Sequence, residues 1–333
     1  MSDNEYTQDW GNISKNYHMK KRAADIAFKF CRAVLLFGMC FLIIQPLLDK
    51  LSVSFMEQQD LYDSTVVSIP RNFTLGNYRL VINLINFWKS IYWTFIIVIS
   101  SAALQVAACT LAGYGFARYK FPLKSFWFFC VMLIIVVPPH TIMASLYLNF
   151  HFFDIFGLFR LITGEPVNLL SNVAGFWLLS ATGMGLKSGL YIFMLRQYFR
   201  GMPKELEEAA WVDGCGKFKT FIRIMVPDAT PMLTSCFLFS FVWQWTDSFY
   251  TTLFLANYKM LSTGLGAIAE RFSQWWSATS SASGAAVASA APVGYTQAII
   301  ATGVLMSLAP LILLYLVAQK AFVESLSQTG IKM

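Results

Sequence analysis

Six long stretches of the chain carry few or no charged residues, and this pattern constrains the fold more than any other feature. A helix needs roughly 20 apolar residues to cross the hydrocarbon core of a bilayer. The stretches of sufficient length are residues 26–48, 91–117, 125–150, 173–195, 229–256 and 295–319. Backbone groups in lipid must be hydrogen-bonded within their own segment, and none of the stretches shows the two-residue alternation of a barrel strand. The sequence therefore predicts an all-α membrane protein with six transmembrane helices.

Composition agrees with a lipid environment. Of 333 residues, 56% are hydrophobic and 13% are charged, whereas about 25% are charged in soluble domains. A single soluble core of this size could not bury so much apolar surface. The net charge of +7 could suggest a nucleic-acid ligand, but the basic residues form short clusters between apolar stretches. We expect membrane lipid around the chain and no nucleic-acid partner.

The distribution of Lys and Arg predicts the orientation. They collect before the first stretch, between the second and third, between the fourth and fifth, and after the sixth, and the alternate connections are poorer in them for their length. Basic loops stay in the cytoplasm, so both termini are predicted to be cytoplasmic. The first stretch is too long for a cleavable signal peptide and is followed by no small-residue cleavage site, so we expect it to remain as a helix.

These boundaries give the predicted organisation. It consists of a cytoplasmic N-terminal tail (1–25), a first helix with an extracytoplasmic segment (26–90), a core of five helices (91–320) and a cytoplasmic C-terminal tail (321–333). A second extracytoplasmic connection, 257–294, contains a tract of Ser, Ala and Gly that predicts a flexible loop.

The cytoplasmic connection 196–227 within the core has unusual chemistry. Pro203 suits the first turn of a helix, and the acidic residues that follow it place negative charge near that helix's N-terminus. Gly214 can end the helix in a left-handed turn. A second short helix is expected over 217–225, ending at Pro227. Such a helix either docks into a groove of another protein or simply joins two spans across the surface.

The spacing in this connection resembles the signature of permease subunits of ABC importers, in which Glu-Ala-Ala is followed at fixed distances by Gly and by Ile-x-Leu-Pro. The matching positions are Glu208, Ala209, Ala210, Gly214, Ile224 and Pro227, with Val226 in place of the usual Leu. Segments 68–78, 111–122, 137–148 and 308–316 also resemble this family in order, so the likeness covers about residues 65–325. The chain resembles the smaller permease subunit of maltose-type sugar transporters.

The resemblance implies a type I importer permease fold in the bacterial inner membrane. It implies transport of a sugar or oligosaccharide, with a second permease subunit (as a heterodimer), two ABC ATPase subunits and an extracytoplasmic solute-binding protein as partners. It assigns the docking of the ATPase to the connection 196–227, and we add two acidic residues, Glu205 and Asp213, to the matching positions as candidate coupling residues.

No phosphate-binding G-x-x-x-x-G-K-[ST] motif occurs in the chain, and no catalytic motif or metal-ligand cluster is recognisable. We therefore expect no enzymatic activity and no cofactor bound by this chain, with ATP and Mg²⁺ held by the partner ATPases.

Candidate substrate-path residues lie within the fourth and fifth apolar stretches. Lys187 is costly in a membrane and could meet an acidic group of a substrate, pair with Asp247, or extend to the interface. Trp243, Gln244, Trp245 and Asp247 place aromatic faces beside polar groups, a combination that suits sugars, although Trp also anchors helices at the lipid interface.

Two prolines in the third stretch, Pro138 and Pro139, could form a gating kink or serve packing alone. Two alternatives to a sugar permease remain open. One is an ABC permease for another polar solute, such as a glycerol phosphate. The other, an ion-coupled secondary transporter, should show repeated halves and several intramembrane acids, and only Asp247 stands out here.

Overall fold

The computed structural model describes residues 3–330 apart from 64, 67, 156 and 283–289. The chain divides into two compact units, residues 1–74 and 75–333. The described parts of both units are built from helices without a named strand, and contain two isolated β-bridges, Met56 with Phe73 and Phe153 with Val167.

The first unit consists of helix α1 (Asp3–Ser54), the short η1 (Asp60–Tyr62) and the loops around it. The segment Asp25–Ser54 of α1 is long and apolar enough to span a membrane, and its most apolar window has no buried residue, as expected for a helix surrounded by lipid. The loop after α1 folds on itself. Asp60 accepts hydrogen bonds from the backbone and side-chain amides of Asn72 at 2.7 and 2.9 Å.

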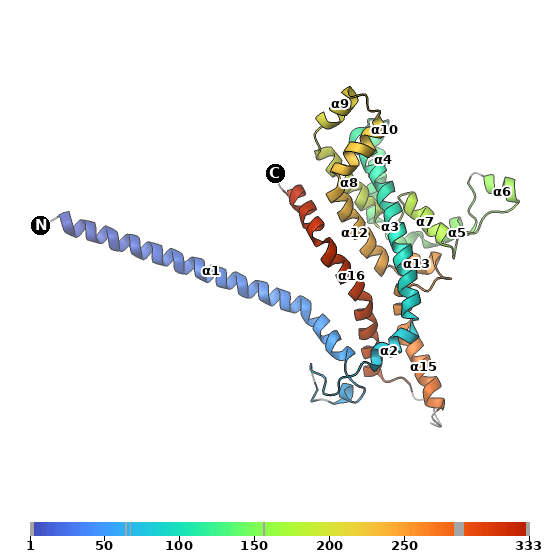
Figure 1. Ribbon diagram of the computed structural model, residues 1–333, viewed down its shortest axis with the longest axis horizontal. Coiled ribbons are helices and arrows are strands. Elements are labelled where there is room, and N and C mark those ends of the chain that lie inside the picture. The colour runs from blue at the N-terminus through green and yellow to red at the C-terminus, as the bar shows by residue number, and fades with distance from the viewer. Residues whose placement is uncertain (1–2, 64, 67, 156, 283–289, 331–333) are drawn as a thin grey trace. The chain divides into compact units, whose positions relative to one another are not determined.

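The second unit contains all remaining elements (Figure 1). They are α2 (Gly76–Leu84), α3 (Phe87–Arg118), α4 (Lys124–Val136), η2 (Pro139–Ile142), α5 (Met143–His151), α6 (Leu158–Thr163), α7 (Val173–Ala181), α8 (Ser188–Gly201), α9 (Glu205–Val212), α10 (Lys217–Thr220), η3 (Phe221–Met225, a π-helical turn), α11 (Val226–Asp228), α12 (Thr230–Thr246), α13 (Phe249–Phe254), α14 (Leu261–Gly266), α15 (Ile268–Ala282) and α16 (Val293–Gly330).

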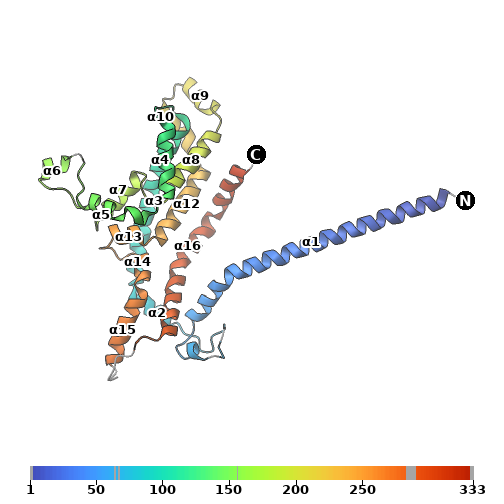
Figure 2. The same cartoon turned by 180° about the vertical axis from the view of Figure 1, so that it is seen from behind.

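Helix α3 is central to this unit. It packs most extensively against α8, and then against α12 and α7, and Figure 2 shows α8 and α12 beside it from the reverse side. The helices α3 and α8 approach closely at Gly113, where an added Cβ would lie 2.8 Å from Cβ of Leu195. Helix α8 meets α4 in the same way at Gly189, whose added Cβ would lie 2.7 Å from the carbonyl oxygen of Val131. Small residues at such contacts are typical of membrane helix packing.

The predicted spans are found as helices, but three of the six are interrupted. In the described residues, Asp25–Ser54, Phe87–Arg118 and Val293–Lys320 are single helices of sufficient length and apolarity. Two further helix pairs pass the same test together and are bent, by 103° between Lys124–Val136 and Pro139–His151 and by 76° between Lys217–Asp228 and Thr230–Thr246. The count of six spans and the cytoplasmic side of the termini remain predictions.

Prolines and polar caps explain two of the interruptions. Helix α4 ends before Pro138, since a proline clashes with the preceding turn and disfavours helical geometry in the residue before it. In the fifth stretch α12 ends at Thr246, and Asp247 has extended backbone. The Asp247 carboxylate then accepts from the backbone N–H of Thr251 at 3.0 Å, which caps the new helix α13.

The fourth stretch is not the uninterrupted helix that we expected. Helix α7 ends at Ala181, and Gly183 adopts φ +69° while the N–H of Met184 bonds to the carbonyl of Leu179. This is the pattern of a helix C-terminus closed by a left-handed glycine. Helix α8 begins only at Ser188, so Lys187 lies in a break between two helices and not inside one.

Two further expectations are corrected. The connection 257–294 is helical over most of its described part, because Ser277–Ala282 belong to α15, and the serine hydroxyls there donate back to carbonyls three or four residues earlier. Residues 283–289 of the Ser/Ala/Gly tract lie outside the described residues. The second predicted helix of the cytoplasmic connection extends slightly further than expected, since it runs over Lys217–Asp228 with Pro227 in its last turn, and the chain then bends by 76° into Thr230–Thr246.

Candidate functional site

Helix α9 lies at one end of α3, on the connection between α8 and α12 (Figure 1). Its outer face mixes acidic and apolar side chains, because Glu205, Glu208, Ala209 and Asp213 are exposed and Val212 retains 88% of its accessible surface. The helix ends where Gly214 takes φ +78°, as predicted from the sequence. A short helix with such an exposed face suits a protein–protein contact.

The inner face of α9 is fixed by a buried charge. Glu207 is 5% exposed, and its carboxylate accepts from the Tyr114 hydroxyl at 2.6 Å and pairs with Nε of Arg118 at 3.2 Å. The guanidinium of Arg118 also donates to the carbonyl of Met202 at 2.9 Å. Tyr114 and Arg118 are four residues apart on α3 and therefore share one helix face. This cluster, which we call the Glu207 latch, ties α9 to the end of α3.

The Glu207 latch was not anticipated from the sequence. From the sequence, Glu207 has only a favourable position near the N-terminus of its helix, Tyr114 belongs to the segment 111–122, and Arg118 belongs both to that segment and to the basic cluster that predicts the orientation. The sequence does contain one signal: Tyr114 and Arg118 are four residues apart at the end of a predicted span. At this spacing both side chains lie on one helix face and can reach the same carboxylate.

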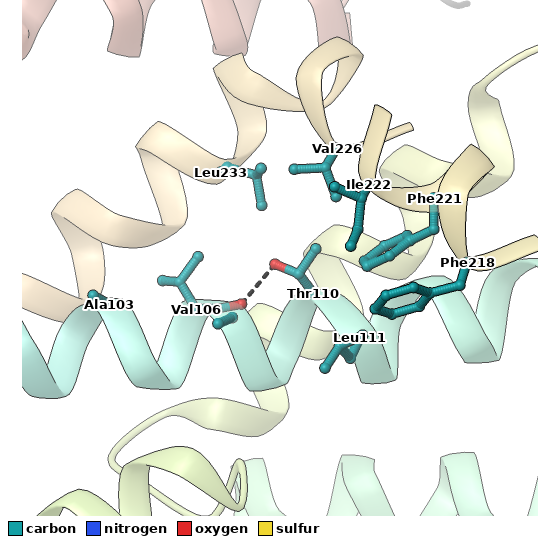
Figure 3. Close-up of a pocket in the computed structure, with 10 residues that line it drawn as sticks. Ala103, Val106, Thr110, Leu111, Phe218, Phe221, Ile222, Val226 and Leu233 are labelled. Carbon is teal, nitrogen blue, oxygen red and sulfur yellow. Dashed lines mark hydrogen bonds between the residues drawn. The ribbon is translucent and has the colours of Figure 1, made fainter. Parts of the chain in front are cut away.

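Beside the latch lies an apolar pocket of about 420 Å³ between α3 and the segment that leads into α12 (Figure 3). Its walls include Val106 and Leu111 of α3, and Phe218, Phe221 and Ile222 of the opposite segment. A threonine hydroxyl in the wall, that of Thr110, is already donated to a backbone carbonyl of α3. The pocket therefore offers no polar group suited to holding a sugar.

A second polar cluster lies in the interior of the unit, centred on Gln105 of α3. The Gln105 amide nitrogen donates to the Leu186 carbonyl at 2.8 Å and to the Ser188 hydroxyl at 2.7 Å. Its oxygen accepts from Ser240 at 2.6 Å and from the amide of Gln244 at 2.7 Å. This cluster, the Gln105 node, joins α3, the break before α8, and α12 through fully buried side chains.

The predicted substrate-path residues occupy different environments. Gln244 belongs to the Gln105 node, and its side-chain oxygen is buried without a hydrogen-bond partner. Trp245 is 1% exposed, stacks on Phe241 and donates to the carbonyl of Ser307, so it lies in the core. Trp243, in contrast, is 46% exposed, and Nζ of Lys187 lies 5.1 Å from the centre of its ring. Their roles in a substrate path remain predictions.

The proposed pairing of Lys187 with Asp247 is not formed. The ion pairs within 4 Å among the described residues are Arg71 with Asp63 and Arg118 with Glu207. Asp247 instead caps α13 through the backbone and hydroxyl of Thr251.

The two prolines of the predicted gating kink stand at the 103° bend between α4 and the helices that follow it. Pro138 is exposed and Pro139 is partly buried. The neighbouring His140 ring contacts that of Phe249 at 4.4 Å, which brings the bend against the start of α13. The structure therefore places a bend where one was expected, and its part in gating remains a prediction.

Comparison with known proteins addresses the identity of the chain. Residues 105–327, about two thirds of the sequence, match the model of the binding-protein-dependent transport system inner membrane component family. The chain belongs to this family. The matched range contains the Glu207 latch, the Gln105 node, α9 and all candidate coupling residues, so these features lie in the family's common part.

Individual relatives of this inner membrane component family agree. A probable ABC transporter permease of Pyrococcus horikoshii is 30% identical over 223 residues, covering 66% of this chain and 74% of that protein. The maltodextrin transport system permease protein MdxG of Bacillus subtilis is 25% identical over 319 residues, covering 94% of this chain and all of the relative. These proteins are permease components of transporters, and this chain is likewise a multi-pass component of the inner membrane.

A solved structure shows the same fold. It is the crystal structure of a bacterial ABC transporter involved in the import of the acidic polysaccharide alginate, and one of its chains aligns with a TM-score of 0.67 at 19% identity, covering 90% of this chain and 98% of that chain. The helical importer-permease fold expected from the sequence is confirmed by this likeness.

Proposed function

We propose that this chain is one transmembrane subunit of an ATP-driven importer that moves a sugar or oligosaccharide delivered by an extracytoplasmic solute-binding protein. A second permease subunit completes the pathway, and two ATPase subunits supply the energy. Sugar permeases among the relatives, including that for maltodextrin, support the substrate class.

The observation that carries this proposal is the construction of α9. Its outer face exposes acidic and apolar side chains, while the buried carboxylate of Glu207 on its inner face contacts Tyr114 and Arg118 of α3. A docking helix that only covered a surface would not need a buried ion pair, which is expensive to desolvate. In our proposal α9 seats on an ATPase subunit, and the Glu207 latch passes its movement to α3.

The test is reconstitution of the chain with its permease partner, ATPase subunits and solute-binding protein in liposomes. Addition of a labelled oligosaccharide should stimulate ATP hydrolysis and give ATP-dependent uptake, and omission of the solute-binding protein should abolish both. Replacement of Val212 by Asp on the exposed face of α9 should weaken ATPase binding while the permease pair still assembles. Unchanged ATPase binding in this variant, or uptake driven by an ion gradient without ATP, would contradict the proposal.

A further inference from the structure

Lys187 is a partly buried cation in the break between α7 and α8. Helix α8 is 14 residues long, so its start at Ser188 lies about 20 Å from the end that leads into α9. Gln105 lies a similar ~20 Å along α3 from Arg118, and Trp243 about 20 Å along α12 from Thr230. Three helices thus place Lys187 about 20 Å from the end of the unit that carries α9, a distance of about two thirds of a 30 Å hydrocarbon core.

The described part of the chain provides no counter-charge within 4 Å of this lysine. Among the described residues, no carboxylate lies within 4 Å of its ammonium group, and the nearest candidate in the sequence, Asp247, is engaged in capping α13. The ammonium group lies over the Trp243 ring, 5.1 Å from its centre. A charged group in this position is costly unless something else neutralises it.

Two other features strengthen the positive character of this place. Lys187 directly precedes α8, so its backbone lies at the N-terminal end of a 14-residue helix, which carries a partial positive charge. The backbone of Lys187 adopts φ +62°, a conformation that lysine rarely takes and that glycine would adopt without strain. Lys187 thus combines an unfavourable backbone conformation with a charge that has no partner within 4 Å among the described residues. This combination favours a function of the side chain itself.

Trp243 supplies the complementary part of a saccharide site. Nearly half of its side chain is exposed, and Lys187 covers only part of the ring at 5.1 Å. An aromatic face packs against the apolar face of a sugar ring, as it does against other apolar groups. A cation beside the same ring is positioned to pair with a carboxylate carried by the sugar.

We infer that Lys187 and Trp243 form a binding site for acidic saccharides, in which the tryptophan contacts the sugar ring and the lysine neutralises a uronate carboxylate. The inference rests on the proposed function and specifies its substrate class. The counter-charge that the chain lacks is then brought by each substrate molecule as it passes.

The experiment uses the complete reconstituted transporter and two matched probes, a galacturonic acid trisaccharide and its methyl ester, together with a neutral trisaccharide. Uptake and substrate-stimulated ATP hydrolysis are measured for the wild type, Lys187→Gln and Lys187→Arg. Glutamine keeps much of the length of lysine without the charge, while arginine keeps the charge. Assembly of each variant with its partners is checked by size-exclusion chromatography.

The expected result is that the wild type transports the free acid in preference to the ester. In Lys187→Gln the half-saturating concentration for the acid should rise by roughly 10- to 100-fold, as for loss of a charge-assisted hydrogen bond. Transport of the ester should change little, and Lys187→Arg should retain most of the preference.

Three results would overturn the inference and leave the proposed function intact: transport of neutral saccharides without the acid, equal loss of acid and ester in Lys187→Gln, or retention of both. Equal loss would instead indicate an ion pair with the permease partner. If no saccharide stimulates ATP hydrolysis in the wild type, the proposed function itself fails.

Discussion

Replacement of Glu207 by Gln tests how firmly α9 is held to α3. Glutamine can still accept from the Tyr114 hydroxyl, but it leaves the guanidinium of Arg118 without its counter-charge. Removal of one partner of a buried ion pair costs about 3–5 kcal/mol, and a hydrogen bond to a charged group contributes about 1.5–3 kcal/mol. Arg118 still donates to the carbonyl of Met202 at 2.9 Å. We therefore expect Glu207→Gln to weaken the attachment of α9 to α3 by about 2–3 kcal/mol, below the full cost of breaking a buried ion pair.

A loss of this size should raise the population with α9 detached by about 30- to 140-fold. Hydrogen exchange of the α9 amides reports such local opening, and it should accelerate in Glu207→Gln while exchange in α3 is unchanged. Glu208→Gln is the matched control, because its side chain is exposed on the same helix, and surface substitutions change stability by less than about 0.5 kcal/mol. Equal exchange rates in the two variants would refute the assignment of the latch.

Two further substitutions probe other parts of the unit. Gln105→Leu removes the donor to the buried Ser188 hydroxyl and the acceptor of the Ser240 hydroxyl, while the amide of Gln244 still donates to Ser240 at 2.9 Å. We expect a loss of about 1–3 kcal/mol in the free energy of unfolding of the assembled transporter and reduced uptake, with exchange in α9 unaffected. Wild-type stability would show that the node is dispensable. Gly214→Ala places a side chain at φ +78° with no atom within 4 Å of the added Cβ. The substitution should therefore cost only the strain of a left-handed backbone, about 1–2 kcal/mol, and should weaken ATPase binding by no more than roughly 30-fold in a pull-down titration. A complete loss of binding would indicate that the glycine itself contacts the ATPase.

The positions of the helices could be predicted because lipid imposes a simple rule on the sequence. Three apolar stretches of sufficient length lie within the continuous helices α1, α3 and α16. The turn at Gly214 was predicted from the conformational freedom of glycine. The same rule could not locate the breaks in the other stretches. Hydropathy does not distinguish a continuous helix from two short helices whose ends are capped inside the protein, as happens before Ser188 and after Thr246.

The polar clusters escaped prediction for a different reason. The Glu207 latch joins residues that are 93 positions apart, and the Gln105 node joins residues up to 139 positions apart. Each partner alone resembles an ordinary polar residue in a helix or loop, and only the packing of α3 against its neighbours brings them within hydrogen-bonding distance. The family resemblance located α9, but it concerns the motif Glu208-Ala209-Ala210, of which Ala210 is buried and the other two residues are exposed, and it contains no information on the buried Glu207 that fixes the helix.

Helix α3 is continuous over 32 residues, about 48 Å, and is held at two places along its length. If the Gln105 node acts as a fulcrum, the helix is a lever whose arms measure about 20 Å to Arg118 and about 27 Å to Phe87. A displacement of 1 Å applied at the latch would then move the far end by roughly 1.4 Å in the opposite direction. Two hydrogen-bonded contacts on one rigid helix would thus convert a push from the ATPase side into a larger opposite motion on the other face of the membrane.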